Sequence, residues 1–206
     1  MSESDGIKLS AAQLDALREI GNVGAGNSAT ALSQIIHHRV EMNVPRVSLV
    51  PLDEVPDIVG GPEVMVVGVF LRVYGQAPSN ILFLMPKDSA FYLADVLLGK
   101  NHGDTQKLDF MDESALMEIG NILAGAYLNA LFCFTQLSLL PSIPALAMDM
   151  AGAILSVVLV QLGQMGDQAL VIETEFLSED DGIKGHFFLV PDPGSLETIL
   201  SAVGVE

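Results

Sequence analysis

The chain has 206 residues, and half of them are hydrophobic, which is enough for a buried core and argues against extended disorder. Its 26 acidic residues outnumber the 9 basic ones and give a formal net charge of −17. Such a charge repels nucleic acid and anionic lipid surfaces, so the composition argues against both as partners and favours a basic protein surface.

The first half of the chain predicts a helix, a strand, a hairpin and a second helix. Ser10, with Gln13 three residues later, is a capping-box signal for a long helix that runs to about His38. The elements after it are a strand at 40–51, whose Pro45 is typical of an edge or a bulge, a hairpin of strands at 63–74 and 79–85, and a helix from Pro86 to Gly99.

The second half predicts the same order with one addition, an apolar segment at 151–164 that favours a helix over a strand. The other elements are a helix at about 112–134, strands at about 145–150, 168–176 and 184–190, and a last helix from about Gly194 to Val203. Short turns between neighbouring strands predict a largely antiparallel sheet with helices packed on it, an α/β fold of the α+β type.

Two features concern the cellular compartment. The single cysteine, Cys133, lies in the apolar run Leu131–Phe134, so we expect a buried, inert thiol and no internal disulfide, as is typical of a reducing cytosol. The acidic, polar residues 1–8 do not resemble a secretion signal. We therefore expect a cytoplasmic protein.

A long uncharged stretch separates Glu118 from Asp149 and is long enough to suggest a membrane span. Polar residues and prolines interrupt it, namely Asn121, Asn129, Gln136, Pro141 and Pro144. We therefore expect a buried helix followed by a strand, and no membrane insertion.

An internal repeat relates the two halves. Residues 16–26 and 115–125 are identical at eight of eleven positions, at a constant offset of 99 residues that also superposes Pro45 on Pro144. Pro86 similarly corresponds to Pro191, and each is followed thirteen residues later by a glycine. The sequence therefore predicts a single domain, 1–206, built from two repeats at about 3–100 and 106–206.

The repeated helices are unusually rich in glycine, with Gly21, Gly24 and Gly26 in one and Gly120 and Gly125 in the other. Each interior glycine costs about 1 kcal/mol relative to alanine, so the five together cost roughly 5 kcal/mol. Close packing between the two halves is the expected compensation for all of them.

The same helices repeat a polar row. Glu19 and Asn22, three residues apart, project from one helix face, and Asp15 extends that row. Ser114, Glu118 and Asn121 repeat the arrangement. The neighbouring residues changed between the copies, since Arg18 corresponds to Met117 and Gly24 to Leu123, whereas the Glu–Asn pair kept its identity and spacing.

A Glu–Asn pair with no nearby His, Ser or Cys lacks an activated nucleophile. Phosphoryl transfer to water demands less of an enzyme, because it depends mostly on positioning and on stabilisation of charge. An amide can hold a water in line for attack, and a carboxylate can anchor a cationic group on a partner. The pair therefore fits an enzyme that inserts a water-holding group into another protein's phosphorylated site.

The pattern Asp/Ser-x-x-x-Glu-x-x-Asn, followed by twenty-two residues and Pro, resembles the signature of the CheC/CheX/FliY phosphatase family. It occurs twice, as Asp15, Glu19, Asn22, Pro45 and as Ser114, Glu118, Asn121, Pro144. Two complete motifs in 206 residues resemble the CheC branch, since CheX members carry one and FliY members add a further domain.

The resemblance implies that the substrate is phosphorylated CheY, which itself supplies the Mg²⁺ and the phospho-aspartate, so that this chain binds no cofactor or metal. It implies that each Glu pairs with a lysine of the regulator while each Asn orients the water. It also implies a pseudo-two-fold fold with one continuous sheet and the two motif helices side by side, and binding to the receptor deamidase CheD near Asp149, as a monomer or a heterodimer with CheD.

Three alternatives stay open at this point. The chain could be a non-catalytic adaptor that sequesters CheY or CheD, although binding alone needs no amide at a fixed offset from a carboxylate. It could bind a metal through His37, His38 and Glu41, although adjacent helical histidines point about 100° apart. Asp149 could be a capping or turn residue before Ala151 instead of a CheD contact.

Overall fold

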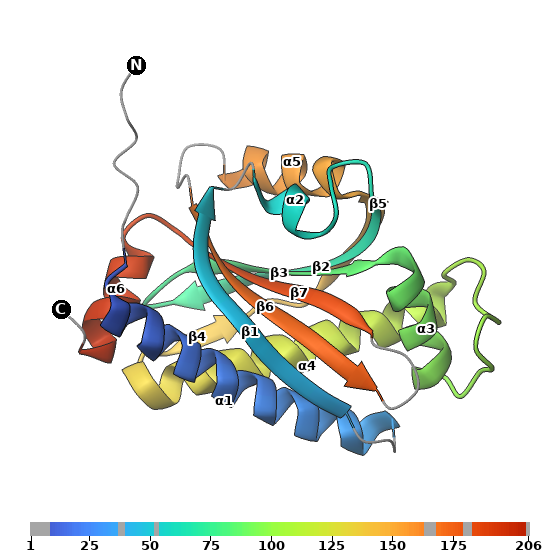
Figure 1. Ribbon diagram of the computed structural model, residues 1–206, viewed down its shortest axis with the longest axis horizontal. Coiled ribbons are helices and arrows are strands. Elements are labelled where there is room, and N and C mark those ends of the chain that lie inside the picture. Colours follow the sequence, from blue (N-terminus) through green and yellow to red (C-terminus); the bar gives the residue numbers. More distant parts are fainter. Residues whose placement is uncertain (1–8, 37–39, 52–53, 163–167, 179–182, 205–206) are drawn as a thin grey trace.

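The computed structural model describes residues 9–36, 40–51, 54–162, 168–178 and 183–204 (Figure 1). The helices are α1 (Ala11–Ile36), α2 (Val55–Ile58), α3 (Lys87–Leu97), α4 (Phe110–Thr135), α5 (Ala151–Leu162) and α6 (Ser195–Val203). The strands are β1 (Val40–Pro51), β2 (Met65–Gly75), β3 (Ser79–Pro86), β4 (Leu139–Pro141), β5 (Ala145–Met150), β6 (Gln168–Ser178) and β7 (Lys184–Pro191).

Most predicted elements are confirmed. The capping box at the start of α1 is present, since Gln13 N–H donates to Ser10 Oγ at 3.2 Å and Ser10 N–H donates to Gln13 Oε1 at 2.9 Å. The segment after Met150 is a helix, as predicted. The predicted end of the first helix at His38 lies outside the described residues. The short elements α2 and β4 were not predicted from the sequence.

Within the described residues, the strands all pair antiparallel in one seven-stranded sheet with the order β1-β6-β7-β3-β2-β4, and β5 also pairs with β2. The sheet is therefore continuous and antiparallel, as predicted. Each outer strand pairs with a strand from the other half of the chain: β1 with β6, and β4 and β5 with β2.

The register of the two sheet edges is the same. Val40 pairs with Ser178 and Pro51 with Gln168 on one edge. On the other, Leu139 pairs with Gly75 and Met150 with Met65. The outer strands thus correspond at the offset of 99 residues that relates the two motif helices.

The two motif prolines lie where the outer strands are interrupted. The register of β1 shifts between Asn43 and Arg46, around Pro45. On the other edge, the chain leaves the sheet between Pro141 and Ala145, around Pro144. Proline has no N–H to donate to the ladder, so an edge strand with a bulge or a break is where a sheet tolerates it. The prediction of an edge or a bulge at Pro45 is confirmed on both counts.

Helices cover both faces of the sheet, with α1 and α4 on one face and α2 and α5 on the other (Figure 1). Successive side chains of β2 point alternately to the two faces of the sheet. Val67, Val69 and Val73 belong to the core under α1 and α4, whereas Val66 packs in a smaller core with Ile154 of α5. This alternation follows from the two-residue period of a strand.

The motif helices α1 and α4 lie side by side, as predicted (Figure 1). Two of their glycines permit close packing. A Cβ on Gly24 would lie 2.6 Å from the Tyr127 ring, and one on Gly120 would lie 2.5 Å from Val69 Cγ1. The same expectation is wrong for Gly26 and Gly125, because a Cβ on either would meet nothing within 4 Å.

The C-terminal end of α4 corrects another expectation, because Cys133 is exposed and not buried. Its neighbours Phe132 and Phe134 are also exposed, whereas Leu131 is buried. The buried face of α4 continues to Thr135, two residues further on, so Cys133 is exposed because it lies on the opposite face of the helix. By length and composition α4 could cross a membrane, but half of its most apolar window is buried within the fold, as in the core helix of a soluble protein.

Replacing Gly120 by alanine should destabilise the fold by up to about 2 kcal/mol. The clash with buried Val69 costs about 1–3 kcal/mol, and the better helix propensity of alanine offsets only part of it. Urea unfolding followed by circular dichroism measures the change. Gly125→Ala in the same helix is the matched control and should stabilise by about 0.5–1 kcal/mol. Equal effects of the two changes would contradict the packing described.

Candidate functional site

The two polar rows lie on the solvent side of α1 and α4. Leu17 and Ile20 of α1 are buried in the core against the sheet, and so are the corresponding Leu116 and Ile119 of α4. Helical periodicity then turns the motif residues outward. In α1 the motif side chains Asp15, Glu19 and Asn22 are all exposed; in α4, Glu118 is exposed, whereas Ser114 and Asn121 are half-buried.

The structure therefore brings two Glu–Asn pairs onto one helical layer, each pair on its own helix. In the part of the chain that the structure describes, the side chains of Glu19, Asn22, Glu118 and Asn121 have no hydrogen-bond or ion-pair partner. Both carboxylates and both amides are free to contact another molecule. Asp15 adds a third carboxylate at the start of the α1 row.

The two rows differ in their surroundings. Phe110 and Met111, in the first turn of α4, are 78% and 58% exposed, whereas the corresponding residues of α1 are Ala11 and Ala12. The row on α4 thus begins beside an exposed apolar surface that the row on α1 lacks. Sequence reasoning missed this difference, although the offset of 99 residues could have shown it.

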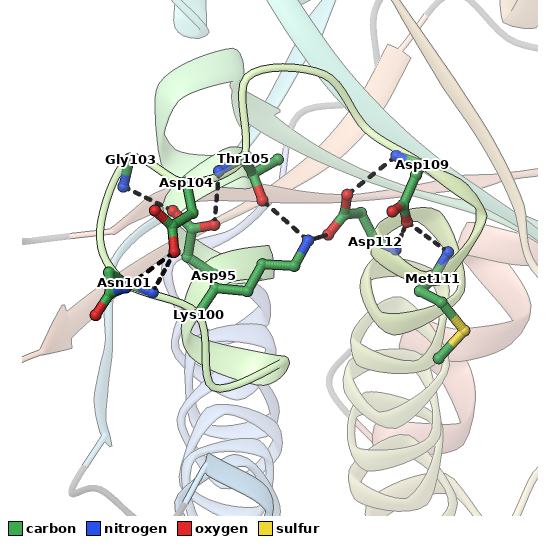
Figure 2. A network of polar contacts seen from close by, with 9 residues as sticks. All are labelled: Asp95, Lys100, Asn101, Gly103, Asp104, Thr105, Asp109, Met111 and Asp112. Atoms are coloured by element: carbon green, nitrogen blue, oxygen red, sulfur yellow. Dashed lines mark hydrogen bonds and ion pairs between the residues drawn. The ribbon is translucent and has the colours of Figure 1, made fainter.

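A polar network fixes the start of α4 (Figure 2). The Asp109 carboxylate accepts hydrogen bonds from the N–H groups of Met111 and Asp112, at 2.8 and 3.0 Å, and the Asp112 carboxylate accepts from Asp109 N–H at 3.0 Å. This reciprocal capping box satisfies helix N–H groups that otherwise lack partners. Buried Asp112 also pairs with Lys100, which raises the lysine's pKa.

The same network holds the connection between α3 and α4. The buried Asp95 carboxylate accepts hydrogen bonds from the N–H groups of Gly103 and Thr105, at 2.8 and 3.0 Å (Figure 2). Burial alone would raise the pKa of Asp95, but these hydrogen bonds and the charge of Lys100 outweigh it and hold the pKa below its ordinary value. Asp95 thus ties this loop, and through Lys100 the start of α4, to the core.

The remaining predicted site residues do not lie in the two helical rows. Pro45 lies in β1, where the register shifts, and Pro144 lies between β4 and β5, where the pairing with β2 is interrupted. Asp149 is exposed in β5, and its carboxylate accepts a hydrogen bond from Met150 N–H at 2.7 Å. Asp149 is thus a strand residue paired with Val66, and its exposed carboxylate is accessible to a partner.

The metal alternative gains no support within the described residues, which contain no group of three or more His, Cys, Asp or Glu side chains that could hold a metal ion. Two of its proposed ligands, His37 and His38, lie outside the described part of the chain.

Comparisons with known proteins bear on these features. The profile of the CheC-like family matches residues 13–49, which include the α1 motif and Pro45. A Bacillus subtilis protein named CheY-P phosphatase CheC is 41% identical, and the match covers 99% of each chain. At this identity and coverage, the chain belongs to the CheC-like family, within the wider CheC/CheX/FliY family.

Solved structures share the fold. FliY from Thermotoga maritima has a TM-score of 0.75 at 19% identity, over 96% of this chain and 98% of that one. The complex of CheX with CheY, BeF₃ and Mg²⁺ from Borrelia burgdorferi has a TM-score of 0.54 at 18% identity, over 87% and 99%. At these identities the likeness shows the fold alone.

Replacing Asp95 by asparagine should destabilise the protein by about 1–3 kcal/mol at pH 7, because an amide cannot accept both backbone hydrogen bonds as the carboxylate does. The folded-state pKa of Asp95 lies below its ordinary value of 3.8, so its contribution is complete above that value and is lost as pH falls through the folded-state pKa. The difference from wild type should therefore shrink as the pH falls from 3.8 through the folded-state pKa.

Urea unfolding at each pH measures the difference. Asp104→Asn is the control, since Asp104 is exposed in the same loop and accepts hydrogen bonds from Asn101, so its replacement should cost less at pH 7. A stability loss in Asp95→Asn that grows as the pH falls would contradict this account.

Proposed function

We propose that this chain is a phosphatase that hydrolyses the phospho-aspartate of the chemotaxis response regulator CheY. Asn22 and Asn121 each orient the attacking water, and Glu19 and Glu118 each anchor a cationic group of the regulator. The observation that carries the proposal is the pair of Glu–Asn arrangements, repeated at the same spacing on two adjacent helices, whose side chains make no hydrogen bond or ion pair with the described residues.

The chemistry suits a carboxylate and an amide that protrude from a helix. Phosphoryl transfer to water passes through a loose transition state, so an enzyme gains most by placing the water in line with the phosphorus. A carboxamide has both a donor and an acceptor with which to orient a water. The carboxylate, one helical turn away, pairs with a lysine of the regulator and fixes the angle of approach.

The catalytic metal belongs to the partner in this proposal. The regulator supplies Mg²⁺ beside its phospho-aspartate, and this chain contributes no metal ligand or cofactor. A CheX protein that shares the fold was crystallised with CheY, BeF₃ and Mg²⁺, which supports a regulator as the partner of this fold. The name of the B. subtilis relative, CheY-P phosphatase, supports the reaction.

The net negative charge of this chain supports a partner with a basic surface. The net charge of −17 and the exposed carboxylates along α1 and α4 favour a basic surface around the partner's lysine. The adaptor alternative shares this electrostatic attraction but gives the two asparagines no role. Truncating the asparagines therefore distinguishes the two functions.

The double variant Asn22→Ala/Asn121→Ala should lose most of the acceleration of CheY-P decay, on the order of 100-fold, a loss typical of removing one group that stabilises the reacting atoms. Its affinity for the regulator should change little, because Glu19 and Glu118 remain. Phosphate release with Mg²⁺ present measures the rate, and calorimetry with BeF₃-treated regulator measures the affinity. Full activity of the double variant would exclude the proposed mechanism, and a wild type that binds without accelerating decay would establish the adaptor.

We also propose that the chain binds the receptor deamidase CheD through β5, with Asp149 at the contact, and that it acts in the cytoplasm as a monomer or as a heterodimer with CheD. Met148, Asp149 and Met150 are exposed along this outer strand, and no strand of the described chain pairs with its far side. An edge strand with accessible side chains is a common place for a partner to dock.

Replacing Asp149 by alanine should weaken CheD binding by about tenfold or more if the carboxylate is a central contact. Basal CheY-P hydrolysis should not change, since β5 carries none of the proposed catalytic residues. Calorimetry with purified CheD measures the affinity. Glu63→Ala, an exposed carboxylate ahead of β2, is the control; equal affinities for all three proteins would remove Asp149 from the interface.

A further inference from the structure

Two helix glycines permit no close contact and no special backbone conformation within the described chain. Gly26 of α1 and Gly125 of α4 are both helical, and neither has a positive φ that would call for glycine. A Cβ on either would meet nothing within 4 Å. A glycine inside a helix lowers stability relative to alanine. Both positions therefore lower the stability of the free protein without permitting any contact with its described residues.

This separates them from two other glycines of the same helices, Gly24 and Gly120. Gly24 allows the Tyr127 ring to lie against α1, and Gly120 allows Val69 to lie against α4. Those two are explained by internal packing.

The positions of Gly26 and Gly125 relative to the asparagines are the same. Gly26 follows Asn22 by four residues, and Gly125 follows Asn121 by four. Residues four apart are neighbours on a helix surface, and each Cα–Cβ bond tilts toward the helix N-terminus. A side chain at either glycine would therefore lean toward the asparagine and cover part of the surface beside it.

A local hydrogen bond does not explain the glycines. Thr30 Oγ1 donates to the carbonyl of Gly26 at 2.9 Å, but any residue at position 26 would offer that carbonyl. The residue that corresponds to Thr30 in α4 is Asn129, so this contact is not common to the two helices.

A contact with the phosphorylated substrate protein explains why glycine occurs at both positions, Gly26 and Gly125. Asparagine is a short side chain, so an amide that holds a water against the phosphorus requires the helix surface itself to come close to the regulator. The surface beside the asparagine is then pressed against the regulator's main chain or side chains, and a methyl group there would hold the two proteins apart. Small displacements from the reactive geometry cost much rate.

We propose that Gly26 and Gly125 are contact positions for the phosphorylated response regulator, kept free of a side chain so that the surface around its phospho-aspartate can close on each helix. This inference rests on the proposed function. The two glycines are positioning residues, since they act on the reaction through the placement of the asparagines.

The test uses the full chain in two backgrounds, each with one intact pair. Asn121→Ala leaves the pair on α1, and Asn22→Ala leaves the pair on α4. Gly26→Ala should lower kcat/KM for CheY-P about tenfold in the first background, and Gly125→Ala should do so in the second, with the larger loss always beside the intact asparagine. Affinity for BeF₃-treated regulator should fall in parallel.

If the two glycines were instead needed for the fold itself, their replacement by alanine would lower stability. The melting temperature of each variant is therefore the second measurement. Both glycine variants should melt at the wild-type temperature or above it, because alanine is the better helix former. Gln34→Ala, an exposed change on α1 about 120° around the helix from Asn22, is the control and should keep wild-type kinetics. A lower melting temperature that accompanies the loss of activity would overturn the inference.

The remaining outcomes distinguish a failure of the proposed role of the two glycines from a failure of the proposed phosphatase function. If wild type accelerates decay and the asparagine variants lose activity, but the glycine variants keep wild-type kcat/KM and affinity, the inference falls and the phosphatase stands. If wild type neither binds the regulator nor accelerates decay, both fall.

Discussion

The packing of α1 and α4 side by side on one face of the sheet is the constraint that determines which of their side chains are exposed. Gly24 of α1 lies against the ring of Tyr127 in α4, and that ring stacks on Phe187 of β7 with centroids 4.2 Å apart. This succession of contacts joins both helices to the central strands. Because one face of each helix is buried here, helical periodicity leaves the Glu–Asn rows on the other. The polar chemistry at the surface is thus positioned by apolar packing beneath it.

Much of this arrangement could be predicted from the sequence, because the chain carries two copies of most signals. The capping residues Ser10 and Gln13, the hairpin around Gly75, and the repeated Glu–Asn spacing each have a local physical cause. Pro45 indicated an edge or a bulge because proline lacks a ladder donor, and both proved correct. The division into repeats at about 3–100 and 106–206, and the roles of the motif residues, stay predictions.

What could not be predicted depends on tertiary contacts. A glycine that packs and a glycine that is open look alike in sequence, and only the position of Tyr127 or Val69 distinguishes them. Cys133 lies in an apolar run and is exposed, because the fold buries the opposite face of α4, which carries Leu131 and Thr135. Asp95 and Lys100 are far from any motif in the sequence, yet they set the start of α4 through a loop whose hydrogen bonds have no periodic signal.

The exchange of outer strands has a consequence for the integrity of the molecule. Since β1 pairs with β6, and β5 with β2, each half of the chain completes the sheet of the other, and neither half has its own edge strand beside its own hairpin. The loop between α3 and α4 is therefore not what holds the two halves together. If the chain were cut in this loop, the two fragments would stay associated through the hydrogen bonds between their strands. By the same reasoning, half of this chain on its own would expose two strand edges and would need a second copy to cover them.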